Sequence, residues 1–422
     1  MPASPAVPVI SSAASATEPA TIHWTEGGEA RSARWRSERG APPPKRVVIA
    51  DDTLAADAAY RLACEGTGLL WRGDFQNARL LLQALARRVD KPAKPKREKR
   101  VKDRKAGEAG SAGAPVASPA PVFPEAFHLH RQAQAQRARV LGMVLIPFDA
   151  DYSIPLRRAP DAKKACAEAW GPSRDGAVPS VASLRELMGF ISSHEWRRKG
   201  VPIPALGEEG PHNRIHPHYG VFSPVRGEYI DLVAQAPVPE GTEDLLGFDI
   251  GTGTGVLAAV LALRSGVQRV IATDQDPRAL ACARDNLKRL GFPQVEVREA
   301  NLFPEGKAHI IVCNPPWLPA RPGSPIEHAV YDEDSRMLLG FLNGLAAHLE
   351  PKGEGWLILS DFAEHLGLRS RAWLLAAIDA AGLKVVDRLD AQPHHPKASD
   401  ASDALHAARA AEVTSLWRLA AK

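Results

Sequence analysis

Cysteine is scarce in this sequence, and the few cysteines present form no recognisable metal or disulfide pattern. The 422-residue chain holds four, at Cys64, Cys166, Cys282 and Cys313, with no C-x-x-C pair among them. Neither a zinc site nor a disulfide framework is therefore indicated, and a reduced, cytoplasmic protein is favoured. No stretch reaches the length and apolarity of a membrane span, so we expect no membrane contact.

The N-terminal end lacks the features of a secretory signal. Residues 1–45 are rich in Ala, Pro and Ser, without a basic n-region or a sustained apolar segment. This composition predicts a disordered tail rather than a signal peptide. The length of the chain and its 45% hydrophobic content provide for two or three units with buried cores.

Excess positive charge is confined to one segment. Lys91–Lys105 holds nine basic and two acidic residues, a local charge of +7 against +4 for the whole chain, so the remainder is acidic. Such a run attracts the phosphates of RNA or DNA without reading their sequence. It is equally typical of a solvated, self-repelling linker, and Gly, Ala, Ser and Pro follow it. We predict a basic, flexible linker over 91–122 and leave both roles open.

Helical patterns flank this linker on both sides. Residues 46–90 place apolar side chains at helical spacing, with Asp74 positioned to cap a helix that begins at Phe75, and they predict a small helical module. Residues 123–210 include SLRELMGFISSHEW, capped by Ser183, and predict a mainly helical substrate-recognition region.

A strand, a glycine-rich turn and a helix follow one another without interruption after residue 244. Leu245–Ile250 is a short, largely apolar run of the kind that forms a strand buried on both faces. Gly251, Thr252, Gly253 and Gly255 then lead into an apolar helix. Glycine tolerates a positive φ and leaves room for a ligand against the main chain. The stretch therefore predicts a nucleoside-binding turn.

Two acids indicate which nucleoside this turn binds. Asp274 ends a second strand, Arg269–Thr273, about 20 residues beyond the glycines, where βαβ nucleotide sites keep the carboxylate that binds the ribose. Asp249 stands just before the turn, where it is unfavourable for a pyrophosphate but suits the cationic amino-acid end of S-adenosylmethionine. The glycines also fall as G-x-G-x-G, not as the G-x-G-x-x-G of dinucleotide sites. S-adenosylmethionine is therefore the predicted cofactor.

A second motif, Asn314-Pro315-Pro316-Trp317, follows the apolar run His309–Cys313. Ligand chemistry in open α/β sheets gathers at the carboxyl ends of the strands. The Asn314 side-chain oxygen and the Pro315 carbonyl can accept the two protons of a planar NH2 group and so aim its nitrogen at a methyl donor. The two prolines preset the backbone, and Trp317 can stack on a flat substrate. These four residues are the predicted catalytic residues.

Together the two motifs resemble those of the class I S-adenosylmethionine-dependent methyltransferases that methylate planar nitrogens. The resemblance is greatest to the HemK/PrmC-like glutamine methyltransferases. RNA methyltransferases of the small methyltransferase domain type, which act on the amino groups of adenine and guanine, come next. It covers Tyr219 to Trp417. By position it assigns Asp249, Gly251, Gly253 and Gly255, with Thr252 among them, to the methionine end of the cofactor, Asp274 to the ribose hydroxyls, and Asn314 and Pro315 to the acceptor nitrogen, Asn314 also bordering the cofactor.

Two positions depart from the pattern of this family. Trp317 stands where the family usually has Tyr or Phe, an NPPW variant of NPPY that keeps the stacking face. Asn301 stands where many relatives carry an Asp near the adenine amino group of the cofactor, and its side-chain oxygen can still accept that hydrogen bond. Glu327 and His328 lie in SPIEHAVY, which resembles the segment that closes over the acceptor in the glutamine enzymes. Either can contact substrate, and a surface role is equally open.

The order of strands and helices predicts an α/β fold. We expect a doubly wound, mostly parallel, seven-stranded Rossmann-like methyltransferase sheet over 211–422, preceded by the mainly helical N-terminal region. An antiparallel hairpin at one edge, with a long loop from Pro393 to Ala410, would distinguish it from a dinucleotide domain. After the first two strands, the predicted helices are Pro277–Leu290, Asp334–Leu349 and Leu368–Ala381, and the predicted strands are Val295–Arg298, His309–Cys313, Gly355–Ser360, LKVVDRLD and EVTSLWRL.

A metal site is not predicted, although three histidines lie close together. His212, His216 and His218 have no cysteine or carboxylate at ligand spacing, and Pro217 stiffens the turn between them.

The predicted function is transfer of a methyl group from S-adenosylmethionine to a planar NH2 nitrogen. A glutamine side-chain amide in a protein loop is the favoured acceptor, and an exocyclic amino group of adenine or guanine in RNA or DNA is the alternative. A catalytically silent nucleoside-binding module is a rival of another class, opposed by the joint presence of Asn314, Pro315 and Asp274. A nicotinamide oxidoreductase is opposed by the glycine spacing and by Asp249.

Overall fold

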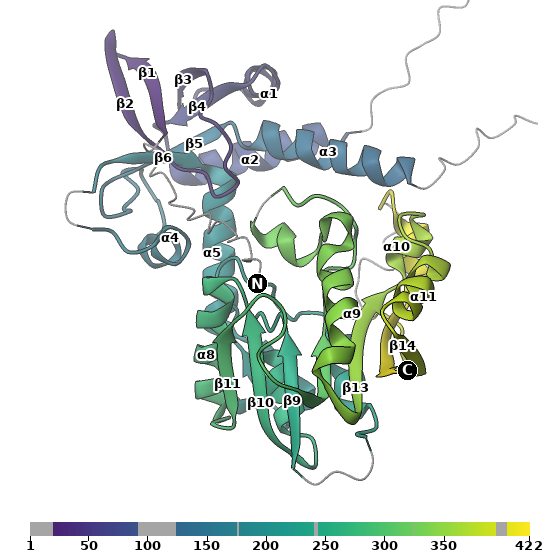
Figure 1. Ribbon diagram of the computed structural model, residues 1–422. Helices are drawn as coiled ribbons and strands as arrows, with labels where there is room; N and C mark the ends of the chain where they lie inside the picture. The colour runs from purple at the N-terminus through teal and green to yellow at the C-terminus, as the bar shows by residue number, and fades with distance from the viewer. Residues whose placement is uncertain (1–19, 92–123, 175–176, 240–243, 324, 394–402) are drawn as a thin grey trace, which may run out of the picture.

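The computed structural model describes residues 20–91, 124–174, 177–239, 244–323, 325–393 and 403–422. Its two large sheets belong to two successive parts of the chain (Figure 1), one of six strands and one of seven. A short two-stranded sheet lies between them in the sequence and consists of β7 (Val201–Pro202) and β8 (Arg214–Ile215). None of the described helices is both long and apolar enough to cross a membrane.

The N-terminal unit is built on a mixed sheet with the strand order β1-β2-β6-β5-β4-β3. The hairpin of β1 and β2 is antiparallel, and β2 pairs in parallel with β6, which comes almost 150 residues later in the chain. The elements of this unit are β1 (Thr21–Glu26), β2 (Glu29–Trp35), β3 (Arg46–Ala50), α1 (Ala56–Cys64), β4 (Thr67–Trp71), α2 (Phe75–Val89), α3 (Glu125–Leu141), β5 (Val144–Phe148), α4 (Lys163–Trp170), β6 (Ser180–Ser183) and α5 (Leu184–Lys199).

Apolar runs and helix caps explain these elements locally. The strands β4 and β5 are buried along their whole length, because TGLLW and VLIPF have helices or strands on both faces. The helix α2 begins where the Asp74 side chain accepts the backbone N–H of Gln76 at 2.9 Å, which confirms the predicted cap. Ser183 likewise caps α5 by accepting the backbone N–H of Arg185 at 3.1 Å.

The predicted secondary structure of the N-terminal half was wrong in two places. Residues 21–35, expected within a disordered tail, form β1 and β2. The expected helical module over 46–90 also contains β3 and β4. Residues 123–210, expected to be mainly helical, form α3, α4 and α5 together with the short strands β5 and β6. These strands are only four to seven residues long, and their partners lie far away in the sequence, so local periodicity favoured the helices beside them. Residues 1–19, and the basic linker from residue 92 onward, lie outside the described residues.

The C-terminal unit contains the predicted seven-stranded sheet, which confirms the α/β fold class. Its strand order is β11-β10-β9-β12-β13-β15-β14, and every pair is parallel except the two that β15 forms with β13 and β14. The elements are α6 (Glu228–Gln235), β9 (Leu245–Ile250), α7 (Val256–Ala262), β10 (Val267–Asp274), α8 (Pro277–Leu290), β11 (Val295–Glu299), β12 (Ala308–Cys313), α9 (Arg336–His348), β13 (Leu349–Ser360), α10 (Phe362–His365), α11 (Arg371–Ala380), β14 (Leu383–Ala391), α12 (His406–Ala410) and β15 (Thr414–Ala421).

Helices cover both faces of this sheet, as a doubly wound fold requires. One buried cluster joins α6, α7 and α8 to the sheet, and a second joins α9 and α11 to its other face. The connection between β14 and β15 was expected to be one long loop, but its last part forms α12, while residues 394–402 lie outside the described residues. The edge hairpin itself is confirmed, with Leu383 aligned with Ala421.

Candidate active site

The predicted site residues gather at one edge of the seven-stranded sheet. Ile250, near the end of β9, is aligned with Thr273 of β10 on one side and with Cys313 of β12 on the other. Because these three strands are parallel, the glycine turn, Asp274 and Asn314 all begin at the same carboxyl edge. The register of the sheet therefore brings the two sequence motifs together.

The glycine turn is held tightly against the end of β10. The backbone N–H of Gly251 donates to the carbonyl of Thr273 at 2.9 Å. Gly251, Gly253 and Gly255 all have φ between +55° and +83°, the left-handed region that side chains disfavour. A Cβ on Gly251 would lie 2.5 Å from Cε of Met337, so the flexible end of that side chain would have to shift. The positive φ at all three positions therefore favours glycine throughout the turn and leaves its backbone open to close approach by a ligand.

Asp249 lies beneath this turn and holds it to the following helix. Its side chain is buried, and its Oδ2 accepts hydrogen bonds from Oγ1 of Thr252 at 2.6 Å and from the N–H of Ala258 at 3.0 Å. Burial raises the pKa of Asp249 to about 7, against the opposing effect of these two donors. A nearby positive charge would favour the ionised form, so the position suits a cationic ligand group.

This raised pKa predicts that S-adenosylmethionine affinity depends on pH. Below about pH 7 the Asp249 carboxyl group of the free protein is protonated. A cationic cofactor group binds the carboxylate form better, so binding at low pH requires this proton to be released. We expect the dissociation constant to fall about tenfold as pH rises from 5.5 to 7, with proton release on binding. Calorimetry in buffers of different ionisation enthalpy measures both quantities. Asp249→Asn should bind with little pH dependence over this range. If the dissociation constant of the wild type did not change with pH, the charge of Asp249 would not contribute to cofactor binding.

Asp274 is pre-positioned at the end of β10 by two backbone donors. Its Oδ2 accepts the N–H of Gly253, and its Oδ1 accepts the N–H of Asp276, each at 3.0 Å. Burial raises the pKa of this carboxyl group as well. Asn301 lies two residues beyond β11 with an exposed side chain, and the N–H of the preceding Ala300 donates to the Asp274 carbonyl at 3.1 Å. The predicted ribose and adenine residues are therefore neighbours along this edge.

Sequence reasoning missed one buried acid near the same turn. Glu228, in the first turn of α6, is 6% exposed, and among the described residues its Oε1 has no hydrogen-bond partner. Burial raises the pKa of the adjacent Tyr229, and the charges of Asp249 and Glu228 raise it further, so both acids lie close to that ring. A buried carboxylate oxygen without a hydrogen-bond partner among the described residues fits a ligand with a cationic group. An acid at the start of an apolar helix just before β9 was the available sequence feature.

The acceptor motif has a hydrogen bond that the sequence did not predict. Nε1 of Trp317 donates to Oδ1 of Asn314 at 2.8 Å, the oxygen expected to receive a substrate N–H. An amide oxygen accepts two hydrogen bonds, so one position remains and the side chain is fixed with its oxygen facing the indole. Pro315 and Pro316 are buried, and Trp317 is half-buried against the cores on both faces of the sheet.

Two arginines hold Trp317 in place. Nη2 of Arg369 donates to the carbonyl of Trp317 at 3.1 Å, and the guanidinium of Arg226 lies 6.0 Å from the centre of its ring. Arg226 is paired with the buried Glu412 at 3.2 Å, which also accepts the hydroxyl of Ser360 at 2.7 Å. Trp317 is thus restrained from both its backbone and its ring, so the orientation of Asn314 is preset.

Two of the three histidines, His216 and His218, are engaged by protein groups. Nδ1 of His216 lies 2.6 Å from the carbonyl oxygen of Arg197, and Nε2 of His218 lies 3.1 Å from a carboxylate oxygen of Asp285. Within the part of the chain that the structure describes, no group of three or more His, Cys, Asp or Glu side chains could hold a metal ion.

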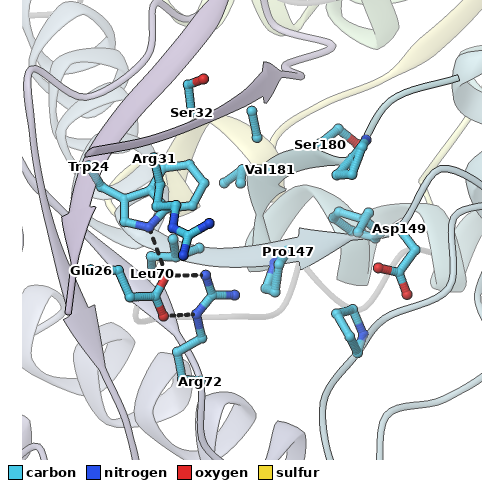
Figure 2. Close-up of a pocket in the computed structure, with 14 residues that line it drawn as sticks. Trp24, Glu26, Arg31, Ser32, Leu70, Arg72, Pro147, Asp149, Ser180 and Val181 are labelled. Carbon is cyan, nitrogen blue, oxygen red and sulfur yellow. Dashed lines mark hydrogen bonds and ion pairs between the residues drawn. The ribbon is translucent and has the colours of Figure 1, made fainter. Parts of the chain in front are cut away.

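A separate cavity of about 350 Å³ lies in the N-terminal sheet, away from both motifs (Figure 2). Glu26 on its wall accepts Nε1 of Trp24 at 2.9 Å and two guanidinium nitrogens of Arg72 at 2.8 and 2.7 Å. That carboxylate is therefore compensated within the wall. Neither Asn314 nor Asp274 lines this cavity, so it is not the site that the motifs form.

Comparison with known proteins points to the same part of the chain. Residues 213–369 match the family described as "Methyltransferase small domain". The release factor glutamine methyltransferase of Mycolicibacterium smegmatis is 35% identical over 132 residues, which are 30% of this chain and 46% of that protein. The ribosomal protein L11 methyltransferase of Pelotomaculum thermopropionicum is 34% identical over 144 residues, which are 33% of this chain and 39% of that protein.

Among solved structures, the ribosomal protein L11 methylase from Lactobacillus delbrueckii subsp. bulgaricus superposes with a TM-score of 0.34 at 17% identity, over 52% of this chain and 92% of that one. The chain spans less than half the length of these two curated relatives, and the match to the family lies in the C-terminal unit. Residues 213–369, which include the glycine turn and the acceptor motif, are therefore similar in sequence to methyltransferases of the small-domain family.

Proposed function

We propose that this chain transfers a methyl group from S-adenosylmethionine to a planar NH2 nitrogen, with a glutamine side-chain amide in a protein as the acceptor. The observation that carries this proposal is the position of Asn314. Its oxygen is fixed by Trp317 at the carboxyl end of β12, beside the glycine turn and Asp274. The glutamine methyltransferase named above supports the choice of acceptor.

The residues of the cofactor side would hold S-adenosylmethionine by its two polar ends. Asp274 would accept hydrogen bonds from the ribose hydroxyls. The turn from Gly251 to Gly255 would lie against the methionine end, whose cationic groups Asp249 and Glu228 would favour. Asn301 would accept from the adenine amino group. When bound, the cofactor supplies an electrophilic methyl group on a sulfonium.

On the acceptor side, the chain contributes mainly positioning. Asn314 Oδ1 and the Pro315 carbonyl would accept the two N–H protons of the acceptor and hold its nitrogen toward the cofactor edge. Trp317, held by Arg369, would offer its face to a planar group. Burial of Pro315 and Pro316 keeps this backbone fixed. The nitrogen that gains a methyl group loses one proton to water or to a carbonyl acceptor, so no dedicated base is required.

The test is methyl transfer by the purified full chain from radiolabelled S-adenosylmethionine into a cell extract, divided afterwards into protease-treated and nuclease-treated portions. Label removed by protease alone, and identified as methylglutamine after complete proteolytic digestion, would support the proposal. Label removed by nuclease alone would assign the reaction to an exocyclic amino group of a nucleic acid and give the Lys91–Lys105 segment a role. Binding of cofactor without any label would favour a silent nucleoside-binding module.

A further inference from the structure

One arginine of the N-terminal unit contacts the loop that follows the acceptor motif at three points. Nη2 of Arg131, on α3, donates to the carbonyl of Arg321 at 2.7 Å. Its guanidinium lies 4.3 Å from the ring centre of Tyr331, and it approaches Oε2 of Glu327 at 3.9 Å. A guanidinium is planar and carries five donors, so one side chain can bridge a carbonyl, a carboxylate and a ring.

The carboxylate of Glu327 completes this arrangement from the side of the loop. It accepts the backbone N–H of Gly323 at 2.8 Å and a hydrogen bond from Arg39 at 3.2 Å. Arg39 follows β2, so two separate elements of the N-terminal unit converge on one acid of the methyltransferase unit. Glu327 was expected to contact substrate or to lie on the surface. Its bonds instead connect the two units.

Backbone hydrogen bonds connect the end of this loop to the residue that follows the acceptor motif. Leu318, the residue after Trp317, donates its N–H to the carbonyl of Val330 at 3.2 Å, and its own carbonyl accepts the N–H of Asp332 at 2.8 Å. Leu318 and Tyr331 thereby form a short parallel bridge. Tyr331, whose ring lies under the Arg131 guanidinium, is therefore paired with Leu318, the residue that follows Trp317.

The same loop also connects to the cofactor turn. The Asp332 carboxylate accepts the N–H groups of Met337 at 3.0 Å and Leu338 at 3.1 Å, at the start of α9. The Cε of Met337 lies next to Gly251, 2.5 Å from where a Cβ on that glycine would be. A displacement of this loop would therefore alter packing beside both motifs.

Apolar packing places α3 where Arg131 can act. Phe127, one turn earlier on the same helix, is 2% exposed and shares a buried cluster with Leu318 and Phe362. Figure 1 shows α3 extending from the N-terminal sheet across the methyltransferase unit toward α10. The helix is thus anchored to the second unit on one face and presents Arg131 to the loop.

We infer that Arg131 is a positioning residue through which the N-terminal unit sets the shape of the acceptor site, an inference that rests on the proposed function. It does not touch the reacting atoms. It holds the segment from Leu318 to Tyr331 in the geometry that keeps Trp317 against Asn314. Loss of this restraint should weaken acceptor binding more than cofactor binding.

The experiment compares Arg131→Gln with Arg137→Gln in the full chain. Arg137 lies on the same helix and is paired with Asp90 at 2.8 Å inside the N-terminal unit, so its loss is a matched control. Hydrogen exchange at the amides of Leu318, Val330 and Asp332 should accelerate about tenfold in Arg131→Gln and stay unchanged in the control. The KM for the acceptor should rise about tenfold, and the Kd for S-adenosylmethionine should change by a smaller factor. Arg131→Lys keeps the charge but not the planar guanidinium, so its exchange rates and its acceptor KM should lie between those of the wild type and those of Arg131→Gln.

Unchanged exchange in Arg131→Gln would overturn the inference, and so would accelerated exchange with an unchanged acceptor KM. The exchange measurement needs no acceptor. If the wild-type chain transferred no methyl group while the loop still loosened in the variant, the failure would belong to the proposed function, and the contact between the units would stand.

Discussion

Replacing Asn314 by alanine is expected to lower the rate of methyl transfer at least about 100-fold while leaving S-adenosylmethionine affinity unchanged. The side chain supplies one of two acceptors for the substrate NH2 group, and positioned polar groups of this kind typically contribute that much. Among the described residues its side-chain oxygen accepts Nε1 of Trp317 and not a group of the glycine turn, so its removal does not break that turn. Single-turnover transfer and calorimetric cofactor binding measure the two quantities separately.

Trp317→Phe provides the comparison for this variant. Phenylalanine keeps an aromatic face but removes the N–H that orients Asn314, so we expect a loss of about tenfold, the equivalent of one hydrogen bond. A full rate in Asn314→Ala would contradict the positioning role outright. A loss in Trp317→Phe as large as that in Asn314→Ala would instead assign most of the effect to the orientation of the amide.

The C-terminal sheet was predictable because its strands and helices alternate regularly along the chain. The helix predicted over Pro277–Leu290 is α8 with the same ends, and the first predicted strand is β9 with the same ends. Here Asp276 caps the helix, Pro277 begins it and Gly291 follows it. The glycine motif then locates the carboxyl edge of the sheet, since βαβ units place their ligands there.

The N-terminal sheet was not predictable by the same reasoning. Its strand β6 has only four residues, SVAS, and it pairs with β2 and β5 from distant parts of the sequence. Burial of such a strand is decided by its neighbours and not by its own pattern. The helices α1, α2 and α5 have clear periodicity and caps, so they dominated the prediction for this region.

At the site, residue types could be predicted but not their partners. The motifs located Asn314 and Asp274 because their chemistry follows from strand ends and spacing. The bond from Trp317 to Asn314 and the contacts of Arg131 depend on side-chain geometry and on packing between units. No short pattern in the sequence encodes contacts between residues almost 200 positions apart.

Replacing Asp274 by alanine is expected to raise the Kd for S-adenosylmethionine by roughly 10- to 100-fold. The variant loses the carboxylate that would accept the ribose hydroxyls, and each hydrogen bond to a charged group contributes about 1.5–3 kcal/mol. It also leaves the N–H of Gly253 without the acceptor that it has at 3.0 Å. Calorimetric titration of the free protein gives the affinity without any need for an acceptor substrate.

A control substitution at Asp276, between β10 and α8, separates loss of the ribose contact from loss of local structure. Asp276 caps α8 by accepting the N–H of Arg278 at 2.9 Å, so Asp276→Ala should lower stability by about 1 kcal/mol yet keep the affinity. The Asp274→Ala substitution should raise the Kd of a cofactor analogue without ribose hydroxyls by a smaller factor than it raises the Kd of S-adenosylmethionine, because the analogue has no hydroxyl to donate to the carboxylate. If the analogue loses as much affinity as S-adenosylmethionine does, Asp274 acts by holding Gly253 and the turn. In that case the ribose would have to be bound by other residues along the same edge, of which Asn301 is the nearest predicted one.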